Sequence, residues 1–438
     1  MRGPFAFDRV LWAATARERA SYPMLDCERS VDCVIIGAGF TGLSAALHLA
    51  EGGRSVAVLE AREPGFGASG RNAGGFLSLY LDHSPSSVEK LLGRERGRRL
   101  NEMVAGGPRL VRELLERHRI DADFDGRGIV VAAHNRGAEA KLETLGQEWR
   151  SCGAGISDLS REALRARTGS GKFGAGLLFT DGGTFNPLAY VRGLARAAKA
   201  AGAEIYGETT ALGITPSAGQ WRVTTAAGVV LARQVLIATD GYAAHASLWP
   251  GLERTYYQIP VAMVTTAPLP EDVATAFRAR VPVADGNKNN PLWLKLDGSN
   301  RLVASLLPPR GDDDSADQVA RPVMEKIRRL YGAVPELRWD HFWIGLVGIP
   351  QERLPRALAL ADGVCAVGGY SGQGIAAATA AGQEYAAYVM GGARQETCRL
   401  PFLDPRPVPL QKAVPRLVRS LAGPLSRITD KTYSNPVK

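Results

Sequence analysis

The sequence predicts an α/β protein, in which a helix-flanked parallel sheet is interrupted by a second domain with an antiparallel sheet. Residues 31–60 follow the order strand, glycine-rich turn, helix, strand. Residues 369–382 begin with another glycine-rich turn that leads into a helix. Residues 251–345 instead alternate short β-rich runs with one long helix near 317–330. The nucleotide-type pattern therefore recurs at both ends of the chain, with a different domain between.

The first of these units is a Rossmann-like dinucleotide-binding pattern. The apolar run 31–36 leads into Gly37, Gly39 and Gly42. These glycines permit a tight turn, the approach of backbone to a pyrophosphate, and close packing of the helix on the strand. Glu60 ends the second strand 23 residues after Gly37, where a carboxylate can accept hydrogen bonds from ribose hydroxyls. The helix between the strands carries apolar residues at helical spacing, namely Leu43, Ala46, Leu47 and Ala50.

The motif alone serves both NAD(P) and FAD, and the next stretches distinguish them. Residues 61–76, AREPGFGASGRNAGGF, and residues 369–382, GYSGQGIAAATAAG, resemble segments of the FAD-dependent amine oxidases of the D-amino-acid oxidase superfamily. The resemblance is strongest to the gamma-glutamylputrescine oxidase-like branch. It extends to a middle crossover helix within 181–205, a strand end at 238–244 and an approach to the flavin at 343–355.

The resemblance implies a Rossmann-like FAD-binding domain with a discontinuous, antiparallel-sheet substrate domain. We expect the FAD-binding domain to comprise 1–80, 181–250 and 346–400, the substrate domain 81–180 and 251–345, and a basic tail 401–438. The motif and the resemblance together place the following residues against FAD: Gly37, Gly39, Phe40, Thr41, Gly42, Glu60, Ala61, Arg62, Gly67, Ala68, Ser69, Arg71, Asn72, Ala73, Gly74, Gly75, Ala211, Thr239, Gly241, Gly369, Gly372, Gln373, Gly374 and Ile375.

The resemblance also implies how the cofactor is held. Relatives that bind FAD covalently use a histidine near the position of Arg71, or a cysteine just before the last flavin segment. Arg71 cannot form that bond, and no cysteine lies between Cys152 and Cys365, so FAD is expected to be non-covalent. Residues 372–375 at a helix start offer N–H groups and a positive dipole end to reduced flavin.

Arg71, Tyr370 and Gln373 are the residues that the resemblance implies in catalysis. For Arg71 the structural alternative is an ion pair with Glu60 or another acid. Closer relatives carry histidine in place of Gln373, which leaves a proton-handling role there open. Relatives that oxidise α-amino acids carry an arginine after Trp-x-Gly-Leu to clamp the substrate carboxylate, whereas this chain has Val347. The departure favours an amine that lacks this carboxylate.

Aromatic walls suit an aliphatic amine, and five residues are candidates to form them, with ordinary core packing as the alternative for each: Tyr256, Tyr257, Trp293, His341 and Trp343. In sarcosine oxidase relatives a lysine near flavin N5 promotes reaction with oxygen, a role open to Lys288 or Lys295. Neither lysine lies in a matching motif, so a surface position is expected for both.

Composition indicates a reducing compartment without a metal site. Five cysteines form no CxxC pair, and Cys33 and Cys365 fall in predicted buried strands. The first thirty residues lack a clean apolar core, so a secretory signal is not expected. No run approaches the roughly 18 apolar residues that cross a bilayer. These features predict a cytoplasmic enzyme.

The net charge of +9 is partly concentrated in two segments. Basic residues at 90–99 suit a solvated helix face. In the tail, Val414, Leu417, Leu421, Leu425 and Ile428 recur at helical spacing among basic residues, a pattern that favours packing on the flavin domain and also suits weak contact with an anionic membrane surface.

These observations predict an FAD-dependent enzyme that oxidises a primary or secondary amine to an imine, with O2 or another acceptor reoxidising FAD. An amino-acid oxidase or dehydrogenase acting on glycine, N-methyl or D-amino acids is also compatible, with the carboxylate held by a loop arginine such as Arg254 or Arg301. An RNA-modifying flavoenzyme and a non-catalytic flavin-bound assembly factor are two more distant hypotheses. No appended nucleic-acid module is recognised, so a nucleic-acid partner is not expected.

Overall fold

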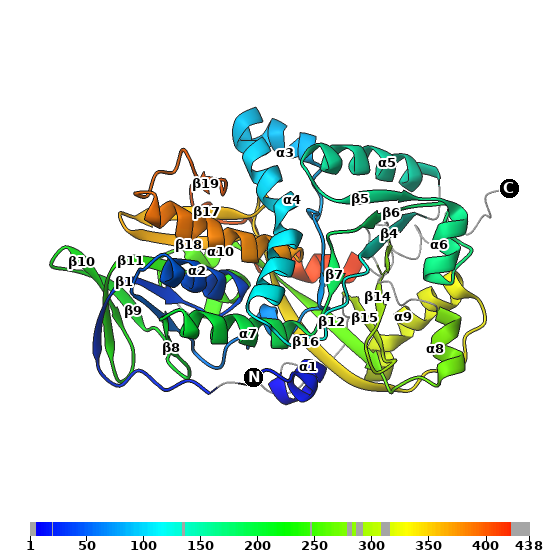
Figure 1. The fold of residues 1–438 in the computed structure, drawn as a ribbon, viewed down its shortest axis with the longest axis horizontal. Coiled ribbons are helices and arrows are strands. Elements are labelled where there is room, and N and C mark those ends of the chain that lie inside the picture. The colour runs from blue at the N-terminus through cyan, green and yellow to red at the C-terminus, as the bar shows by residue number, and fades with distance from the viewer. Residues whose placement is uncertain are drawn as a thin grey trace.

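The computed structural model describes residues 6–19, 21–133, 136–245, 248–277, 283–285, 292–307 and 316–421. Two large sheets lie side by side along the long axis, with a long helix standing between them (Figure 1). The helix is α4 (Arg94–Arg117). The first sheet draws its strands from three separate stretches of the chain, and the second fills the intervals between them.

The first sheet is mostly parallel and is centred on β1 (Glu28–Ile36). Its order is β19 (Phe402–Leu403), β17 (Arg356–Ala361), β18 (Val364–Gly368), β11 (Val229–Ile237), β1, β2 (Val56–Leu59) and β8 (Glu204–Tyr206). Strand β1 pairs in parallel with β11 and β2, while β9 (Gly213–Ser217) and β10 (Gln220–Thr224) extend β11 as an antiparallel insertion. The predicted first unit and the predicted parallel sheet are both confirmed.

Alternate residues of β1 face two different apolar clusters. Cys33 and Ile35 pack with helices α2 (Phe40–Glu51), α7 (Pro187–Ala200) and α10 (Gly374–Met390). Val34 and Ile36 face the other side, with residues of β10 and β11. A parallel sheet that is covered on both faces is apolar at successive positions of its central strands, which explains the apolar run 33–36 in the sequence.

The second sheet is antiparallel except for one pair. Its order is β16 (Trp339–Ile349), β12 (Tyr257–Thr266), β15 (Leu302–Leu306), β14 (Trp293–Leu296), β13 (Val283–Asp285), β4 (Ile129–Ala133), β6 (Ala175–Phe179) and β5 (Ile156–Leu159). One face packs on α9 (Ala316–Tyr331) and residues of α8 (Glu271–Phe277). The long helix and the β-rich runs predicted here are confirmed.

The opposite face of the second sheet is turned toward the first domain. Along β16, Phe342 and Ile344 join the cluster under α9, whereas Trp343 joins the cluster that contains α2, α7 and α10. Met263 of β12 lies directly opposite Trp343 and belongs to the same cluster. The two-residue period of the strands therefore divides this sheet into an α9 side and a side that meets the nucleotide-type domain.

The remaining elements lie before, within and between the strands of these sheets. They are α1 (Leu11–Thr15), α3 (Pro85–Leu92), α5 (Arg136–Ser151), α6 (Arg161–Thr168), β3 (Gly75–Phe76), β7 (Gly183–Thr184) and the 3-10 turns η2 (Phe7–Arg9), η3 (Ala68–Gly70), η4 (Asp240–His245) and η5 (Leu252–Thr255). Strand β3 pairs with β7 in a separate two-stranded sheet. The basic segment 90–99 spans two helices, because Gly93 adopts a φ of 86° between α3 and α4.

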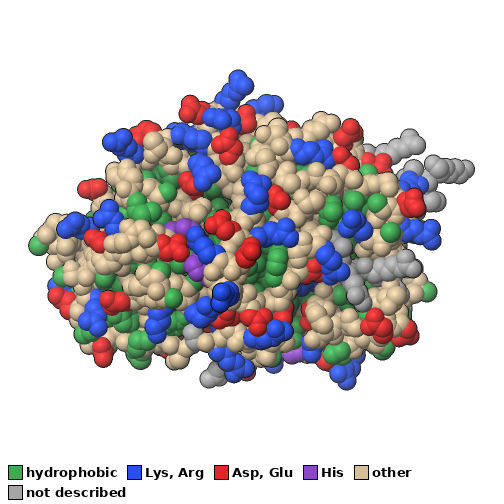
Figure 2. All heavy atoms as spheres, viewed as in Figure 1, with side chains coloured by type: hydrophobic (Ala, Val, Ile, Leu, Met, Phe, Trp, Pro, Cys, Tyr) green, Lys and Arg blue, Asp and Glu red, His purple; other side chains and the backbone are tan. Residues whose placement is uncertain are grey.

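The charged side chains are spread over the surface. On the face in Figure 2, lysines and arginines stand among acidic residues and form no continuous stripe. In the tail, residues 413–421 are helical, and Leu417 and Leu421 are exposed rather than packed. Leu425 and Ile428 lie outside the described residues, so the expected packing of the whole tail stays a prediction.

Candidate functional site

The turn between β1 and α2 has the geometry that phosphate binding needs. Gly37 adopts a φ of 106°, and a Cβ at Gly42 would lie 2.0 Å from the carbonyl oxygen of Gly37. Gly39 is the N-cap of α2 and makes no side-chain capping bond. The first turn of α2 therefore offers N–H groups and its positive dipole end to an anion.

Glu60 closes this turn from the neighbouring strand. Its carboxylate accepts hydrogen bonds from the N–H groups of Ala38 (2.8 Å) and Arg62 (3.0 Å). Burial raises the pKa of Glu60, and these backbone bonds act in the opposite direction. Ala61 and Arg62 are exposed beyond it, and Ala211 is buried nearby in the apolar cluster of the first sheet.

Thr239 supplies a polar atom that fits a bound cofactor. Its Oγ1 is buried and has no hydrogen-bond partner among the described residues. Its methyl group lies 3.6 Å from where a Cβ would stand on Gly37. Buried hydroxyls are normally bonded, so an orphaned one beside a phosphate-binding turn fits a dinucleotide such as FAD.

The loop 67–75 runs from this turn toward the second sheet. Ser69 Oγ accepts from the N–H of Phe40 (3.1 Å), which ties the loop to the start of α2. Asn72 fixes its shape by donating to the carbonyls of Ala68 and Ser69 and accepting from the N–H of Gly74. Further along, Gly75 lies against the Trp293 ring. Gly67 faces the ring of Tyr242, and Ala73 is half-buried.

Arg71 is buried where the loop meets β16. Its Nε donates to the carbonyl of Phe66 (2.8 Å), and its guanidinium lies 4.8 Å from the Phe66 ring and 5.0 Å from the Phe7 ring. A Cβ at Gly345 would approach its Cβ to 3.3 Å. Desolvation lowers the pKa of Arg71. Arg71 and Glu60 are both among the described residues and form no ion pair with each other, so the alternative of an ion pair stays open for another acid only.

The late loop 369–375 meets the first unit at the same edge. Asp240 Oδ1 accepts from the N–H of Gly369 (2.7 Å), and a Cβ at Gly241 would lie 2.6 Å from the backbone nitrogen of Gly348. The Tyr370 hydroxyl lies 2.7 Å from Thr41 Oγ1. Gln373 is the N-cap of α10 without a side-chain capping bond, so the N–H groups of Gly374 and Ile375 begin the helix uncapped.

Three of the predicted pocket residues lie on the same face of the second sheet. Strand pairing places one row of residues across this face: Trp293, Ser305, Met263 and Trp343. The neighbouring row on the same face consists of Lys295, Val303, Thr265 and His341. The Trp343 indole is fully buried and donates to the Arg71 carbonyl (2.8 Å). Trp293 Nε1 and Thr265 Oγ1 are buried without a hydrogen-bond partner among the described residues.

The two tyrosines lie elsewhere. Tyr256 is buried under the Arg356 guanidinium (5.1 Å), behind the late loop. Tyr257 donates to the carbonyl of Pro409 (2.9 Å) at an exposed position near the C-terminal segment. The structure therefore places Trp293, His341 and Trp343 on one face of the second sheet, with Trp343 against Arg71, and places the two tyrosines at the start of β12, away from those rows.

Lys295 is buried, which corrects the surface position predicted from the sequence. Its side chain is 3% exposed, and its Nζ donates to the carbonyl of Phe185 (3.1 Å). It lies beside Gly74, where a Cβ would come within 3.0 Å of Nζ. Desolvation lowers the pKa of Lys295 to about 8. Strand β14 alternates faces, which places Lys295 on the inner side. Lys288 lies outside the described residues.

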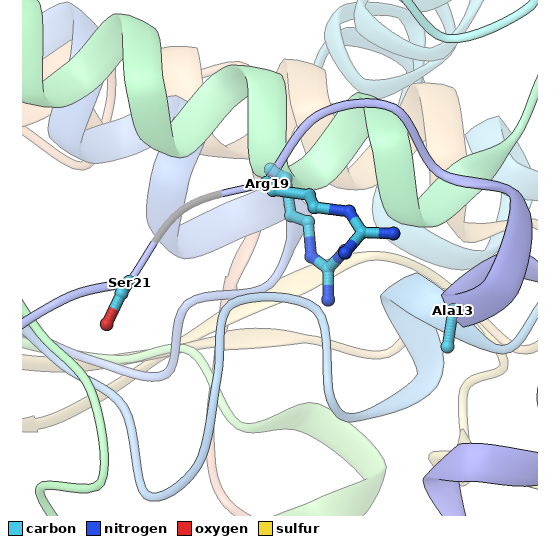
Figure 3. A pocket seen from close by; sticks show the side chains of 4 residues that line it. Ala13, Arg19 and Ser21 are labelled. Carbon is cyan, nitrogen blue, oxygen red and sulfur yellow. The ribbon is translucent and has the colours of Figure 1, made fainter.

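Sequence reasoning missed the segment before the nucleotide-binding unit. Val10, Leu11 and Trp12 are buried, and the Trp12 indole donates to the carbonyl of Asn72 (2.8 Å). A cavity of about 370 Å³ lies next to this segment and is lined by Ala13, Arg19, Ser21 and Arg192 (Figure 3). The run of apolar residues Val10, Leu11 and Trp12, which comes before any recognised motif, is the signal that indicates burial here.

The described part of the chain offers neither a metal centre nor a membrane span. No group of three His, Cys, Asp or Glu side chains among those residues could hold a metal ion. No helix in the same part of the chain is long and apolar enough to cross a membrane.

Known proteins resemble this chain along most of its length. Gamma-glutamylputrescine oxidoreductase of Escherichia coli is 30% identical over 385 residues, covering 88% of this chain and 89% of that protein. L-proline dehydrogenase from P. horikoshii superposes with a TM-score of 0.71 at 18% identity, covering 84% of this chain and 95% of that chain. Glycine oxidase from Bacillus cereus superposes with a TM-score of 0.66 at 21% identity, covering 83% of this chain and 96% of that chain. The two solved structures share the fold.

A family model described as FAD dependent oxidoreductase matches residues 32–388, which include both glycine-rich units and the second sheet between them. The protein is therefore an FAD-dependent oxidoreductase and belongs to the DAO family.

Proposed function

We propose that the protein oxidises a primary or secondary amine to an imine, which water then hydrolyses, and that O2 or another acceptor reoxidises FAD. The observation that carries the proposal is Val347. It lies on the side of β16 that carries Trp343, and its Cγ1 is 3.8 Å from where a Cβ would stand on Gly372. At the place where a carboxylate clamp would stand, the chain presents an aliphatic side chain.

The surroundings of two loop arginines argue against their replacing that clamp. The Arg254 side chain is 64% exposed and its Nε lies 3.8 Å from the Glu253 carboxylate. The Arg301 guanidinium is 3.6 Å from Asp297, at the end of β15. The similar E. coli protein is named for an acylated diamine, and an acylated polyamine is the substrate class that we assign here.

FAD, when bound, accepts a hydride at its N5 atom from the carbon beside the amine nitrogen. The chain has to select the unprotonated amine, because only that form has a nitrogen lone pair to assist. Two buried cations belong to this part of the site: Arg71 is a residue of the loop 67–75, and Lys295 lies beside Gly74 of the same loop. Like charges disfavour an ammonium ion near them, so they favour binding of the neutral amine.

Negative charge on the reduced cofactor also has partners in this chain. The uncapped start of α10 supplies N–H groups and a positive dipole end. The Lys295 side chain adds a full positive charge while it is protonated. Burial lowers the pKa of Lys295, whereas Asp297 and Asp125 raise it. Water is kept out by Trp12 and Trp343, whose rings meet edge to face at 5.9 Å.

A second candidate is an amino-acid oxidase or dehydrogenase. Lys295 favours it, because a buried ammonium that donates to the Phe185 carbonyl still carries further N–H donors for a carboxylate. One measurement distinguishes the two proposals. In anaerobic titrations of bound FAD, acylated polyamines bleach the flavin band if the amine proposal holds, whereas bleaching by glycine, N-methyl or D-amino acids alone would support the second candidate and contradict the first.

A further inference from the structure

We propose that Trp12 is a positioning residue for Lys295: it shields the ammonium group from water and holds it against the loop 67–75 that faces FAD. The inference rests on the proposed function, because the placement of FAD along this loop is part of it. It assigns a role in the flavin site to a segment that precedes the whole nucleotide-binding unit.

The contacts of Trp12 point in three directions. Its Nε1 donates to the carbonyl of Asn72, whose amide holds the loop in shape. Its ring meets Trp343 at 78°, and the Lys295 Nζ lies 4.9 Å from its centroid. A cation over an indole face, away from water, is attracted to the ring. Trp12 therefore touches the loop, the second sheet and the buried cation together.

Lys295 has few other partners. Its Nζ donates to the Phe185 carbonyl, and among the described residues no carboxylate lies within salt-bridge distance of it. Besides the indole, the Phe185 carbonyl and the position of Gly74 lie next to the ammonium. The nearest acids are each paired with an arginine: Asp297 with Arg301, Asp125 with Arg127, and Asp123 with Arg17.

The segment that carries Trp12 is anchored on both sides of it. Val10 and Leu11 are buried, and Thr15 Oγ1 accepts from Asn186 (3.1 Å). Arg17 bridges to Asp121 at 3.0 Å and to Asp123. Because these contacts do not involve Lys295, the segment holds the indole in place independently of the cation.

The consequence is a controlled protonation state beside FAD. Dry surroundings lower the pKa of Lys295, and Asp297, Asp125 and Asp123 raise it. If water replaces the indole, the desolvation is relieved and the pKa of Lys295 rises toward the ordinary value of 10.5. Loss of the attraction to the ring acts in the opposite direction, and it is smaller than the desolvation, which is the largest influence on this pKa. A role limited to packing would change stability without changing this titration.

Sulfite provides a readout that needs no amine substrate. It adds reversibly to flavin, bleaches the visible band, and forms an anionic product that a nearby cation stabilises. In the FAD-loaded protein we expect sulfite affinity to fall through a midpoint near 8 as Lys295 loses its proton. In Lys295→Met, we expect sulfite affinity to be about tenfold weaker than in wild type below pH 8, without a fall in affinity near that pH. Any pH dependence that remains in this variant reports the titration of sulfite itself.

Substitutions of Trp12 then test the positioning role. Trp12→Leu moves the midpoint upward by about one pH unit or more, and Trp12→Phe moves it part of the way. Trp149→Phe, which changes an equally buried tryptophan against Tyr80, leaves it unchanged. An unchanged midpoint in Trp12→Leu, or a Lys295→Met profile that superimposes on wild type, overturns the proposal.

If Trp12→Leu does not fold, chemical labelling decides. An amine-reactive reagent, with mass spectrometry of the FAD-loaded protein, measures how accessible Lys295 is. We expect Trp12→Phe to label Lys295 several-fold faster than wild type, with Trp149→Phe at the wild-type rate. Equal rates in wild type and Trp12→Phe overturn the proposal. Neither assay uses an amine substrate. A failure of the proposed amine oxidation can therefore be distinguished from a failure of the proposed role of Trp12.

Discussion

The hydroxyl groups of Thr41 and Tyr370 lie 2.7 Å apart, and this contact joins the first turn of α2 to the late glycine-rich loop 329 residues away. Both groups are buried. The bond therefore ties together the two segments that we place against FAD.

Tyr370→Phe removes this bond and keeps the ring. We expect FAD affinity to fall about three- to tenfold, the equivalent of one buried hydrogen bond. Equilibrium titration of the apoprotein with FAD measures it. Thr41→Val should weaken binding similarly, and the double variant should lose little more than either single one. Additive losses would show that the two hydroxyls act separately.

Gly42 is a glycine of the first unit that leaves no room for a side chain. A Cβ there would lie 2.0 Å from the Gly37 carbonyl oxygen, so Gly42→Ala should destabilise by about 3 kcal/mol or more and reduce bound FAD. Gly106→Ala is the control, because the nearest atom to its Cβ is 3.9 Å away on an arginine side chain. Thermal unfolding and flavin content compare them. Equal behaviour of the two variants would contradict the close packing.

Asp240 makes stability depend on pH. Burial raises the pKa of Asp240 to about 6, above the roughly 3.9 of an unfolded chain. Between these values the folded state binds more protons, so stability falls as pH rises from about 4 to about 6 and stays lower above that.

Asp240→Asn removes the charge while its side-chain oxygen can still accept from Gly369, and asparagine tolerates the φ of 41° at this position. We expect the free energy of unfolding of this variant to stay constant between about pH 4 and pH 6. At neutral pH we expect it to equal the wild-type value or to exceed it by roughly 1–3 kcal/mol. Denaturant unfolding at several pH values measures this. A variant less stable at neutral pH would show that attraction to Arg356 outweighs burial.

Val347→Arg tests the substrate class. An arginine on this face of β16 supplies the bidentate partner that a carboxylate needs. We expect kcat/KM for amines to fall at least about tenfold and activity on N-methyl or D-amino acids to rise, relative to a Val347→Leu control. If both variants lose amine activity equally and gain nothing, position 347 does not set the preference.

The sequence predicts the regular parts of this fold well. Glycine spacing and apolar periodicity at 31–60 report local requirements, namely a turn with positive φ at Gly37 and a helix against a buried strand, and both are present. The long helix of the second domain is similarly evident from its amphipathic period. These patterns are local, so they can be recognised without knowing the tertiary structure.

The site is less predictable, because its contacts join distant segments. Lys295 has the sequence context of an exposed strand residue, and only the register of β14 with β15 turns it inward. Trp12 precedes every recognised motif and reaches Asn72 through tertiary packing. Tyr257 begins β12 and Tyr256 ends the preceding turn, and the two side chains have different partners, the Pro409 carbonyl and the Arg356 guanidinium. Residue types identified the candidates, but their orientation depended on strand pairing.

The proposed activity is oxidation of amines that lack an α-carboxylate. It is tested most directly by the absorbance of bound FAD, without oxygen, during titration with polyamines, acylated polyamines, N-methyl amino acids and D-amino acids. We predict that the visible flavin band bleaches with polyamines or their acylated forms and returns when an acceptor is admitted. Bleaching by amino acids alone, or by no compound despite tight FAD binding, would contradict the proposed activity.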